Sequence, residues 1–138
     1  MKVVTDMFYT PERAHFDDAG LDFRTPEGFI LKPGESKVLD LGVKIEIPVG
    51  YFGKMESKSG LMVNHGIICM GGVIDSGYRG TIKIRLINLG DEEYVFHEND
   101  KVVQMVIIPC LLCKPEKAYS IEKSESGRDD AGFGSTGK

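Results

Sequence analysis

Two stretches of the sequence carry residue types that could bind a phosphate group. The sequence ends in GFGSTGK, residues 132–138, which has the G-x-x-x-x-G-K spacing of a P-loop. Lys58 and Ser59 stand side by side ahead of an apolar run, so an ammonium group, a hydroxyl and the amides of a helix start could converge on an anion. A capped helix with a solvated lysine would explain this second stretch equally well.

The C-terminal stretch lacks the context of a P-loop. That loop needs a buried strand before it, and a hydroxyl residue and a helix after its lysine. The preceding residues, SIEKSESGRDD, are polar and charged, and nothing follows Lys138 in this sequence. We therefore expect an arm that carries backbone amides, two hydroxyls, an aromatic ring and the Arg128 guanidinium.

A third stretch, GGVIDSGYRG at residues 71–80, places one carboxylate in a tight turn. Asp75 supplies the carboxylate, between a glycine pair and a Ser-Gly turn signal. Taken alone, the stretch predicts a β-hairpin with a turn aspartate. Two other polar side chains, Asp22 and Gln104, interrupt apolar surroundings and need partners there.

No direct metal site is predicted. The three histidines are scattered, and Cys110-x-x-Cys113 has no second pair that would complete four zinc ligands. The three cysteines are an odd number and too few to staple a domain of this size. We therefore expect free thiols and a reducing compartment.

Short strands separated by glycine and proline form the expected body. Apolar residues alternate with polar ones, or run nearly unbroken, in residues 42–48, 81–88 and 101–108. Residues 59–65 have the pattern of a short helix, with Ser59 as N-cap and Gly66 as stop. These elements predict an all-β fold, an antiparallel sandwich or jelly roll with one short helix.

Both ends depart from the strand pattern. The segment DDAGLDF, residues 17–23, puts acidic residues beside a glycine, and periodicity is lost from Glu122 onward. We expect one domain over residues 1–121 and a flexible, glycine-rich tail over residues 122–138.

Charge and hydropathy exclude several classes of partner. A formal net charge of -4 argues against a broad electrostatic grip on nucleic acid. No apolar run approaches the about 20 residues of a membrane span, and the N-terminal residues lack the apolar run of a signal peptide. We expect a soluble, cytoplasmic protein that binds neither nucleic acid nor membranes.

Five motifs together resemble the trimeric dUTPase family. They follow the family's order over nearly the whole sequence: AGLDF (19–23), SKSGL (57–61), GVIDSGYRG (72–80), NDKVVQMVI (99–107) and RDDAGFGSTG (128–137). The resemblance implies a dUTPase-like jelly-roll sandwich whose C-terminal flap closes over a bound nucleotide. It also implies hydrolysis of dUTP to dUMP and pyrophosphate by a homotrimer with shared active sites.

The resemblance implies a role for each site residue. Asp75 matches the carboxylate that orients and deprotonates the water attacking the α-phosphorus, and Tyr78 matches the ring that lies under the deoxyribose and excludes ribonucleotides. Mg²⁺ would be carried by the triphosphate and water, and Asp22 would support a metal-bound water or a neighbouring cation. The other substrate-binding matches are Lys58, Ser59, Gly60, Gly72, Val73, Ile74 and Gln104 in the body, and Arg128, Phe133, Gly134, Ser135 and Thr136 in the flap.

The sequence departs from the family pattern in three motifs. Lys58 and Lys101 stand where the family commonly has arginine, and a lysine contacts phosphate without the directional fork of a guanidinium. Asp129 and Ala131 replace glycines of the flap. We expect a working enzyme whose flap closes less readily than in a glycine-rich relative.

Two alternatives use the same fold. A dCTP deaminase would carry a glutamate proton shuttle where Arg85 stands, and tends to have tryptophan where Tyr78 stands, whereas this sequence has no tryptophan. A nucleotide-dependent regulator of a protein partner would bind dUTP without turnover. Pyrophosphate release from dUTP, compared between the wild type and Asp75→Asn, separates these readings.

Overall fold

Strands dominate the computed structural model, which describes residues 1–126. Their bounds are β1 Lys2–Thr5, β2 Gly20–Arg24, β3 Phe29–Leu31, β4 Ser36–Asp40, β5 Val43–Glu46, β6 Tyr51–Ser57, β7 Ile67–Cys69, β8 Val73–Ile74, β9 Lys83–Asn88, β10 Tyr94–Phe96 and β11 Lys101–Pro109. One helix, α1 Ser59–His65, follows β6. No helix within these residues is long and apolar enough to cross a membrane.

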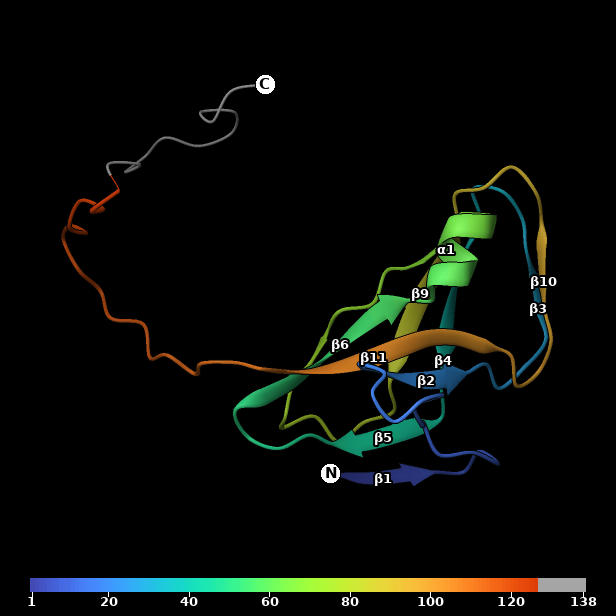
Figure 1. Cartoon of the computed structure of the whole chain (residues 1–138), viewed down its shortest axis with the longest axis horizontal. Coiled ribbons are helices and arrows are strands. Elements are labelled where there is room, and N and C mark those ends of the chain that lie inside the picture. The colour runs from blue at the N-terminus through green and yellow to red at the C-terminus, as the bar shows by residue number, and fades with distance from the viewer. Residues whose placement is uncertain (127–138) are drawn as a thin grey trace.

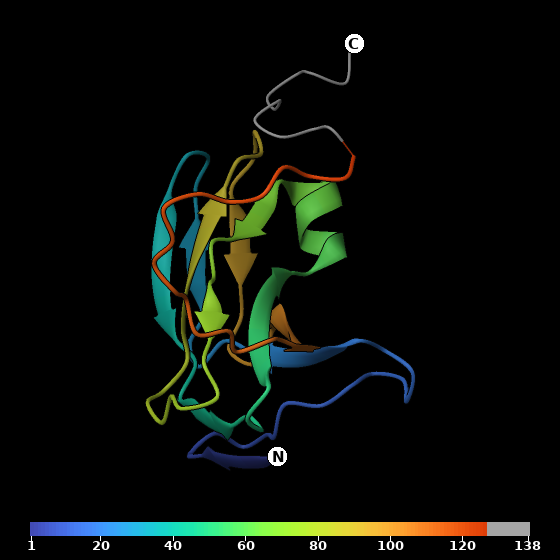
Figure 2. The same ribbon diagram turned by 90° about the vertical axis from the view of Figure 1, so that its left-hand side faces the viewer.

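The strands form antiparallel sheets whose neighbours are mostly far apart in sequence. The largest sheet has the order β2-β11-β6-β8, and a three-stranded sheet has the order β4-β9-β7 (Figure 1). Two ribbons, β1-β5 and β10-β3, complete the described body. This architecture confirms the predicted all-β, jelly-roll-like sandwich with one short helix, and Figure 2 shows the same body from the side.

The alternation of side chains explains how the sheets enclose one core. In β9, Ile84 and Leu86 are buried, while Lys83 and Arg85, which alternate with them, are exposed. In β11, Met105 lies opposite Leu21 of β2 and Met55 of β6, and all three are buried. Each buried side chain of this kind contributes about 1.5–3 kcal/mol to folding.

Strand β2 corrects one expectation. The segment around Gly20–Phe23 was expected to depart from the strand pattern, but it pairs with β11 and is buried along its length. Leu21 and Phe23 face the core, whereas Asp22 points to the opposite face and is nearly as buried. A carboxylate can occupy this place because charged side chains from distant elements meet it.

Helix α1 begins one residue away from the expected cap. Lys58, not Ser59, is the N-cap, and no side chain caps the first turn. Gly66 ends the helix in the left-handed conformation, with φ of 66°, as predicted. A side chain there would also collide with the next loop, because a Cβ on Gly66 would lie 2.5 Å from the Gly90 nitrogen.

The turn that contains Asp75 connects two different sheets. The chain turns at Ser76–Gly77, where the Tyr78 amide donates to the Asp75 carbonyl at 3.0 Å. However, β8 pairs with β6, while β9 lies between β4 and β7. The predicted turn is therefore correct, and the predicted β-hairpin is wrong.

After β11 the chain leaves the sheets as an extended segment (Figure 1). Leu111, Leu112, Tyr119 and Ile121 are all exposed along it. Regular strand structure ends at Pro109 within the described residues, and the boundary predicted at residue 121 stays a prediction.

Candidate active site

The turn after β8 places an aspartate and a tyrosine on one hollow, here called the Asp75 pocket. It has a volume of about 170 Å³ and is lined by Val73, Ile74, Asp75, Tyr78 and Lys83. The two polar groups that the sequence singled out in this stretch therefore face a common space. Lys83 adds a cation that sequence reasoning missed.

Lys83 escaped notice because its sequence position is ordinary. It alternates with buried residues of β9 and pairs with Asp40 at 3.6 Å, as a solvated lysine would. Only the packing of the turn against β9 brings it to the same pocket as Asp75. A period-two pattern predicts that it faces outward but not which surface it meets.

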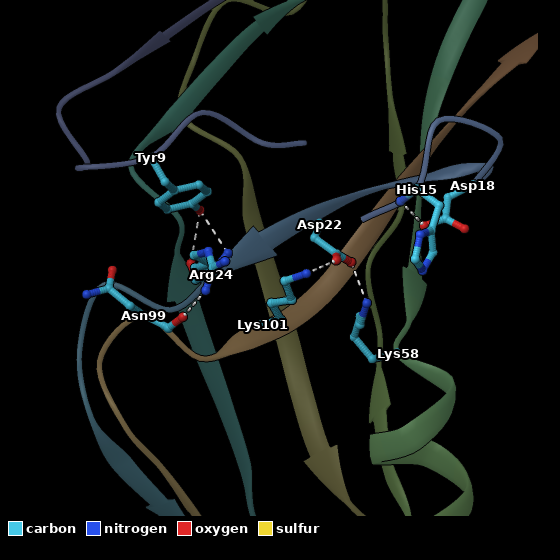
Figure 3. A network of polar contacts seen from close by, with 8 residues as sticks. All are labelled: Tyr9, His15, Asp18, Asp22, Arg24, Lys58, Asn99 and Lys101. Atoms are coloured by element: carbon cyan, nitrogen blue, oxygen red, sulfur yellow. Dashed lines mark hydrogen bonds and ion pairs between the residues drawn. The ribbon is translucent and has the colours of Figure 1, made fainter. Parts of the chain in front are cut away.

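A second group of charges, here called the Asp22 cluster, consists of Asp22 in β2, Lys58 before α1 and Lys101 at the start of β11 (Figure 3). Asp22 accepts a hydrogen bond from Lys58 at one carboxylate oxygen and from Lys101 at the other, the latter at 2.7 Å. The Asp22 side chain is 7% exposed, whereas those of Lys58 and Lys101 are 27% and 35% exposed. The carboxylate is thus buried between two lysines that still reach solvent.

The electrostatics of the Asp22 cluster keep its carboxylate ionised. Burial alone would raise the pKa of Asp22, but hydrogen bonds from Lys101 and Lys58 and their positive charge outweigh burial, so its pKa lies below the ordinary value. One carboxylate beside two ammonium groups leaves a net positive charge. An anion approaching Lys58 would therefore meet a favourable field.

Gln104 lies beside this cluster. On β11 it stands opposite Asp22 of β2 and Glu56 of β6, and its amide donates to the Ser57 carbonyl at 3.1 Å. Gly20 makes room for it, because a Cβ there would lie 2.8 Å from the Gln104 amide carbon. The partner that the sequence required for Gln104 is the backbone at the end of β6.

Ser59 and Gly60 open helix α1 next to Lys58 and are exposed. A Cβ on Gly60 would meet nothing within 4 Å, and the same is true of Gly72 before β8. The space beside the Cα atom of each of these glycines is therefore open. The predicted site residues Arg128, Phe133, Gly134, Ser135 and Thr136 lie outside the described residues.

One chain does not bring its two groups of candidate residues together. Ile74, next to Asp75, pairs with Gly53 near the start of β6, whereas Lys58 follows the end of that strand. The five residue-to-residue steps from Gly53 to Lys58 span about 16 Å of extended backbone. The Asp75 pocket and the Asp22 cluster of the same chain are therefore too far apart to grip one α-phosphate.

Within residues 1–126, no group of three or more histidine, cysteine or acidic side chains could hold a metal ion. Asp22 does not fit a magnesium ligand, because a lysine occupies each of its oxygens. Cys69, Cys110 and Cys113 are free, as predicted, and Cys113 is exposed. A larger hollow of about 380 Å³, lined by His65 and the loop from Gly90 to Tyr94, lies apart from both groups.

Known proteins resemble the chain over nearly its whole length. Residues 6–137 match the family model described as dUTPase. The chain is 45% identical over 129 residues to the deoxyuridine 5'-triphosphate nucleotidohydrolase of Clostridium novyi, covering 92% of this chain and 89% of the relative. It is 41% identical over 139 residues to the enzyme of that name from Clostridium acetobutylicum, covering 99% and 94%.

Solved structures agree with this match. The dUTPase of Staphylococcus bacteriophage 80alpha, solved with dUPNHPP, has a TM-score of 0.90 and 27% identity, covering 99% of this chain and 98% of that one. A mutant dUTPase from phage phi11 of S. aureus, in which a structural Mg(II) ion is coordinated, has a TM-score of 0.79 and 26% identity, covering 86% and 96%. The motifs, the sheet architecture and these relatives lead to one conclusion: the chain belongs to the dUTPase family.

Proposed function

We propose that the protein hydrolyses dUTP to dUMP and pyrophosphate, with Asp75 orienting and deprotonating the water that attacks the α-phosphorus. Relatives at 41–45% identity are named for hydrolysis of deoxyuridine 5'-triphosphate. The observation that carries the proposal is the Asp75 pocket, in which one turn holds a carboxylate beside an aromatic ring. A carboxylate is a weak base, but a water held in line with phosphate needs mainly positioning and some proton acceptance.

The edge of β8 supports recognition of uracil by the backbone. Within residues 1–126, β8 has β6 as its only strand partner and so forms an edge of the sheet. Backbone donors and acceptors of Gly72, Val73 and Ile74 on the outer side can then pair with a base. A fixed set of such groups favours uracil over cytosine, because the wrong base would leave buried polar groups unpaired.

The Asp22 cluster supports the phosphate end of the proposed site. Lys58 supplies the ammonium, Ser59 and Gly60 supply amides and a hydroxyl, and Gln104 lies on the adjacent strand. In this role Asp22 holds a cation, which is one of the two functions expected from the sequence. Arg128, Phe133, Gly134, Ser135 and Thr136 would close over the nucleotide.

We infer that the active protein is a homotrimer with shared sites. The separation of the two groups along β6 supports shared sites, because both groups could act on one nucleotide only if the Asp75 pocket of one chain met the Asp22 cluster of another. The extended segment after β11 supports this assembly, because four large apolar side chains are exposed along it and would be covered by a neighbour.

Magnesium would be carried by the triphosphate and water. When bound, the ion would neutralise charge on the phosphate oxygens. This arrangement agrees with the chemistry of the described residues, since the most buried carboxylate, Asp22, is already paired with two lysines. The free thiols support a reducing compartment such as the cytoplasm.

Pyrophosphate release from dUTP with Mg²⁺ tests the proposal. We expect turnover by the wild type, a loss of about 10²–10⁴-fold in Asp75→Asn, and little change in Asp17→Asn, which makes the same substitution on an exposed loop. Equal hydrolysis by Asp75→Asn and the wild type would contradict the assigned role of Asp75. Tight dUTP binding without turnover in the wild type would favour a regulatory protein instead.

The deaminase alternative has little support. Arg85, which stands where that enzyme needs a glutamate, is exposed on β9 and donates to the Ser36 hydroxyl at 2.8 Å. A guanidinium cannot accept the proton that the deamination requires. Release of ammonia from dCTP would restore this reading.

A further inference from the structure

The ring of Tyr78 lies directly on the backbone of Gly80. A Cβ on Gly80 would lie 2.6 Å from Cζ and 3.0 Å from Cε2 of that ring, and closer still to the phenolic oxygen. Ordinary contact begins near 3.4 Å, so the ring would have to move by at least 0.8 Å to admit a methyl group. Glycine at position 80 is what allows the ring to take this place.

A hydrogen bond ties the far end of the same ring. The Tyr78 hydroxyl donates to the carbonyl oxygen of Thr81 at 2.8 Å. The Thr81 side chain is itself held, because its hydroxyl donates to Asp40 at 2.8 Å. The Tyr78 side chain is thus held at its hydroxyl by Thr81, while its ring lies against the backbone of Gly80.

Arg79 fixes the turn on its other side. One guanidinium nitrogen donates to the carbonyls of Ser76 and Tyr78 at 2.7 and 2.8 Å, and another lies 3.8 Å from the carboxylate of Glu46 in β5. The backbone that carries the ring is therefore braced against a neighbouring strand. These contacts oppose a shift of the turn that would carry the Tyr78 ring away from Gly80.

We propose that Gly80 and the Thr81 carbonyl are positioning residues that set sugar specificity by holding the Tyr78 ring in one place. This inference rests on the proposed function and on the role that the family resemblance implies for Tyr78, whose ring would lie under the deoxyribose. A ring can exclude a 2'-hydroxyl only if it does not yield, since a pocket that adapts rejects an added hydroxyl weakly. A ring that moved by 0.8 Å would give up much of the space that it denies to ribose.

The ratio of kcat/KM for dUTP to kcat/KM for UTP tests the proposal. Tyr78→Phe keeps the ring and removes its tether, so we expect the ratio to fall about fivefold, the worth of one neutral hydrogen bond. Gly80→Ala displaces the ring, and we expect a fall of at least about tenfold, since misplacement by about 1 Å has large effects. Gly77→Ala adds the same methyl group to the same turn, where it meets nothing within 4 Å, and the ratio should stay within about twofold.

The ratio separates positioning from general damage. A variant that is merely less stable loses activity toward both nucleotides alike and keeps the ratio. If Gly80→Ala does not fold, Tyr78→Phe alone decides. Wild-type ratios in both variants, or a wild type that hydrolyses dUTP and UTP equally well, would overturn the inference and leave the proposed function standing. A wild type that hydrolyses neither nucleotide would overturn both.

Discussion

Replacing Asp22 with asparagine tests how much the Asp22 cluster stabilises the fold. The substitution keeps the shape of the side chain but leaves Lys58 and Lys101 facing each other without the carboxylate between them. Removing one partner of a buried ion pair costs about 3–5 kcal/mol. Since the lysine side chains are 27% and 35% exposed and can turn to water, we expect the lower end of this range, about 3 kcal/mol.

Urea unfolding at a fixed protein concentration measures this loss. With a slope of about 2 kcal/mol per molar urea, the midpoint at pH 7 should fall by about 1.5 M. The folded-state pKa of Asp22 is lowered, so its contribution is complete above the unfolded-state value of about 3.9 and is lost as the pH falls through the lower folded-state value. The difference in the free energy of unfolding between the wild type and Asp22→Asn should therefore become smaller below about pH 4.

The matched control is Asp17→Asn, the same change on an exposed loop, which should alter stability by less than about 0.5 kcal/mol. A loss of stability in Asp22→Asn no larger than in this control would refute the reasoning. A difference in the free energy of unfolding between the wild type and Asp22→Asn that stays unchanged in acid would also refute it, because the carboxylate charge would then not be the source of the stability.

Three further predictions concern glycines and thiols. Gly66→Ala should destabilise the protein by more than about 1 kcal/mol in urea unfolding, because it strains a left-handed cap and places a Cβ 2.5 Å from a backbone nitrogen in the next loop. An unchanged unfolding midpoint would contradict this. Gly20→Ala should displace the Gln104 amide and raise KM for dUTP with a smaller change in kcat. An unaltered KM would contradict the role of Gln104 in phosphate binding. Burial raises the pKa of Cys69 to about 11, so at pH 8 a thiol reagent should label the exposed Cys113 before Cys69. Peptide mass spectrometry can follow the two labelling rates, and equal rates would contradict the burial of Cys69.

The sequence predicted those strands whose pattern is local. Alternation of apolar residues is visible in β5 and β9, and the almost unbroken apolar run of β11 matches its central position. Strand β2 was missed as a strand because Asp22 interrupts its apolar run. The two lysines that stabilise this buried carboxylate come from elements far away in sequence. The periodicity of a segment cannot predict partners of this kind.

The same distinction applies to the candidate site. Asp75 and Tyr78 could be predicted to meet because a short turn connects them, and the structure places both on one pocket. Which sheets the turn connects depends on long-range pairing, so a hairpin was predicted where the chain crosses from one sheet to the other. The separation of Asp75 from Lys58 likewise follows from the register of β8 on β6, which no single motif contains.

The position of β11 in the largest sheet has a consequence for synthesis of the chain. Although β11 is the last strand of the described body, it lies between β2 and β6 and pairs with both. As the polypeptide leaves the ribosome, β2 and β6 stay without the strand that pairs with both of them, and the sheet can form only after residue 109 has emerged. This sheet therefore cannot form in the nascent chain before β11 has been synthesised, and a message broken before that point would release a product in which the edges of β2 and β6 that pair with β11 are left unpaired.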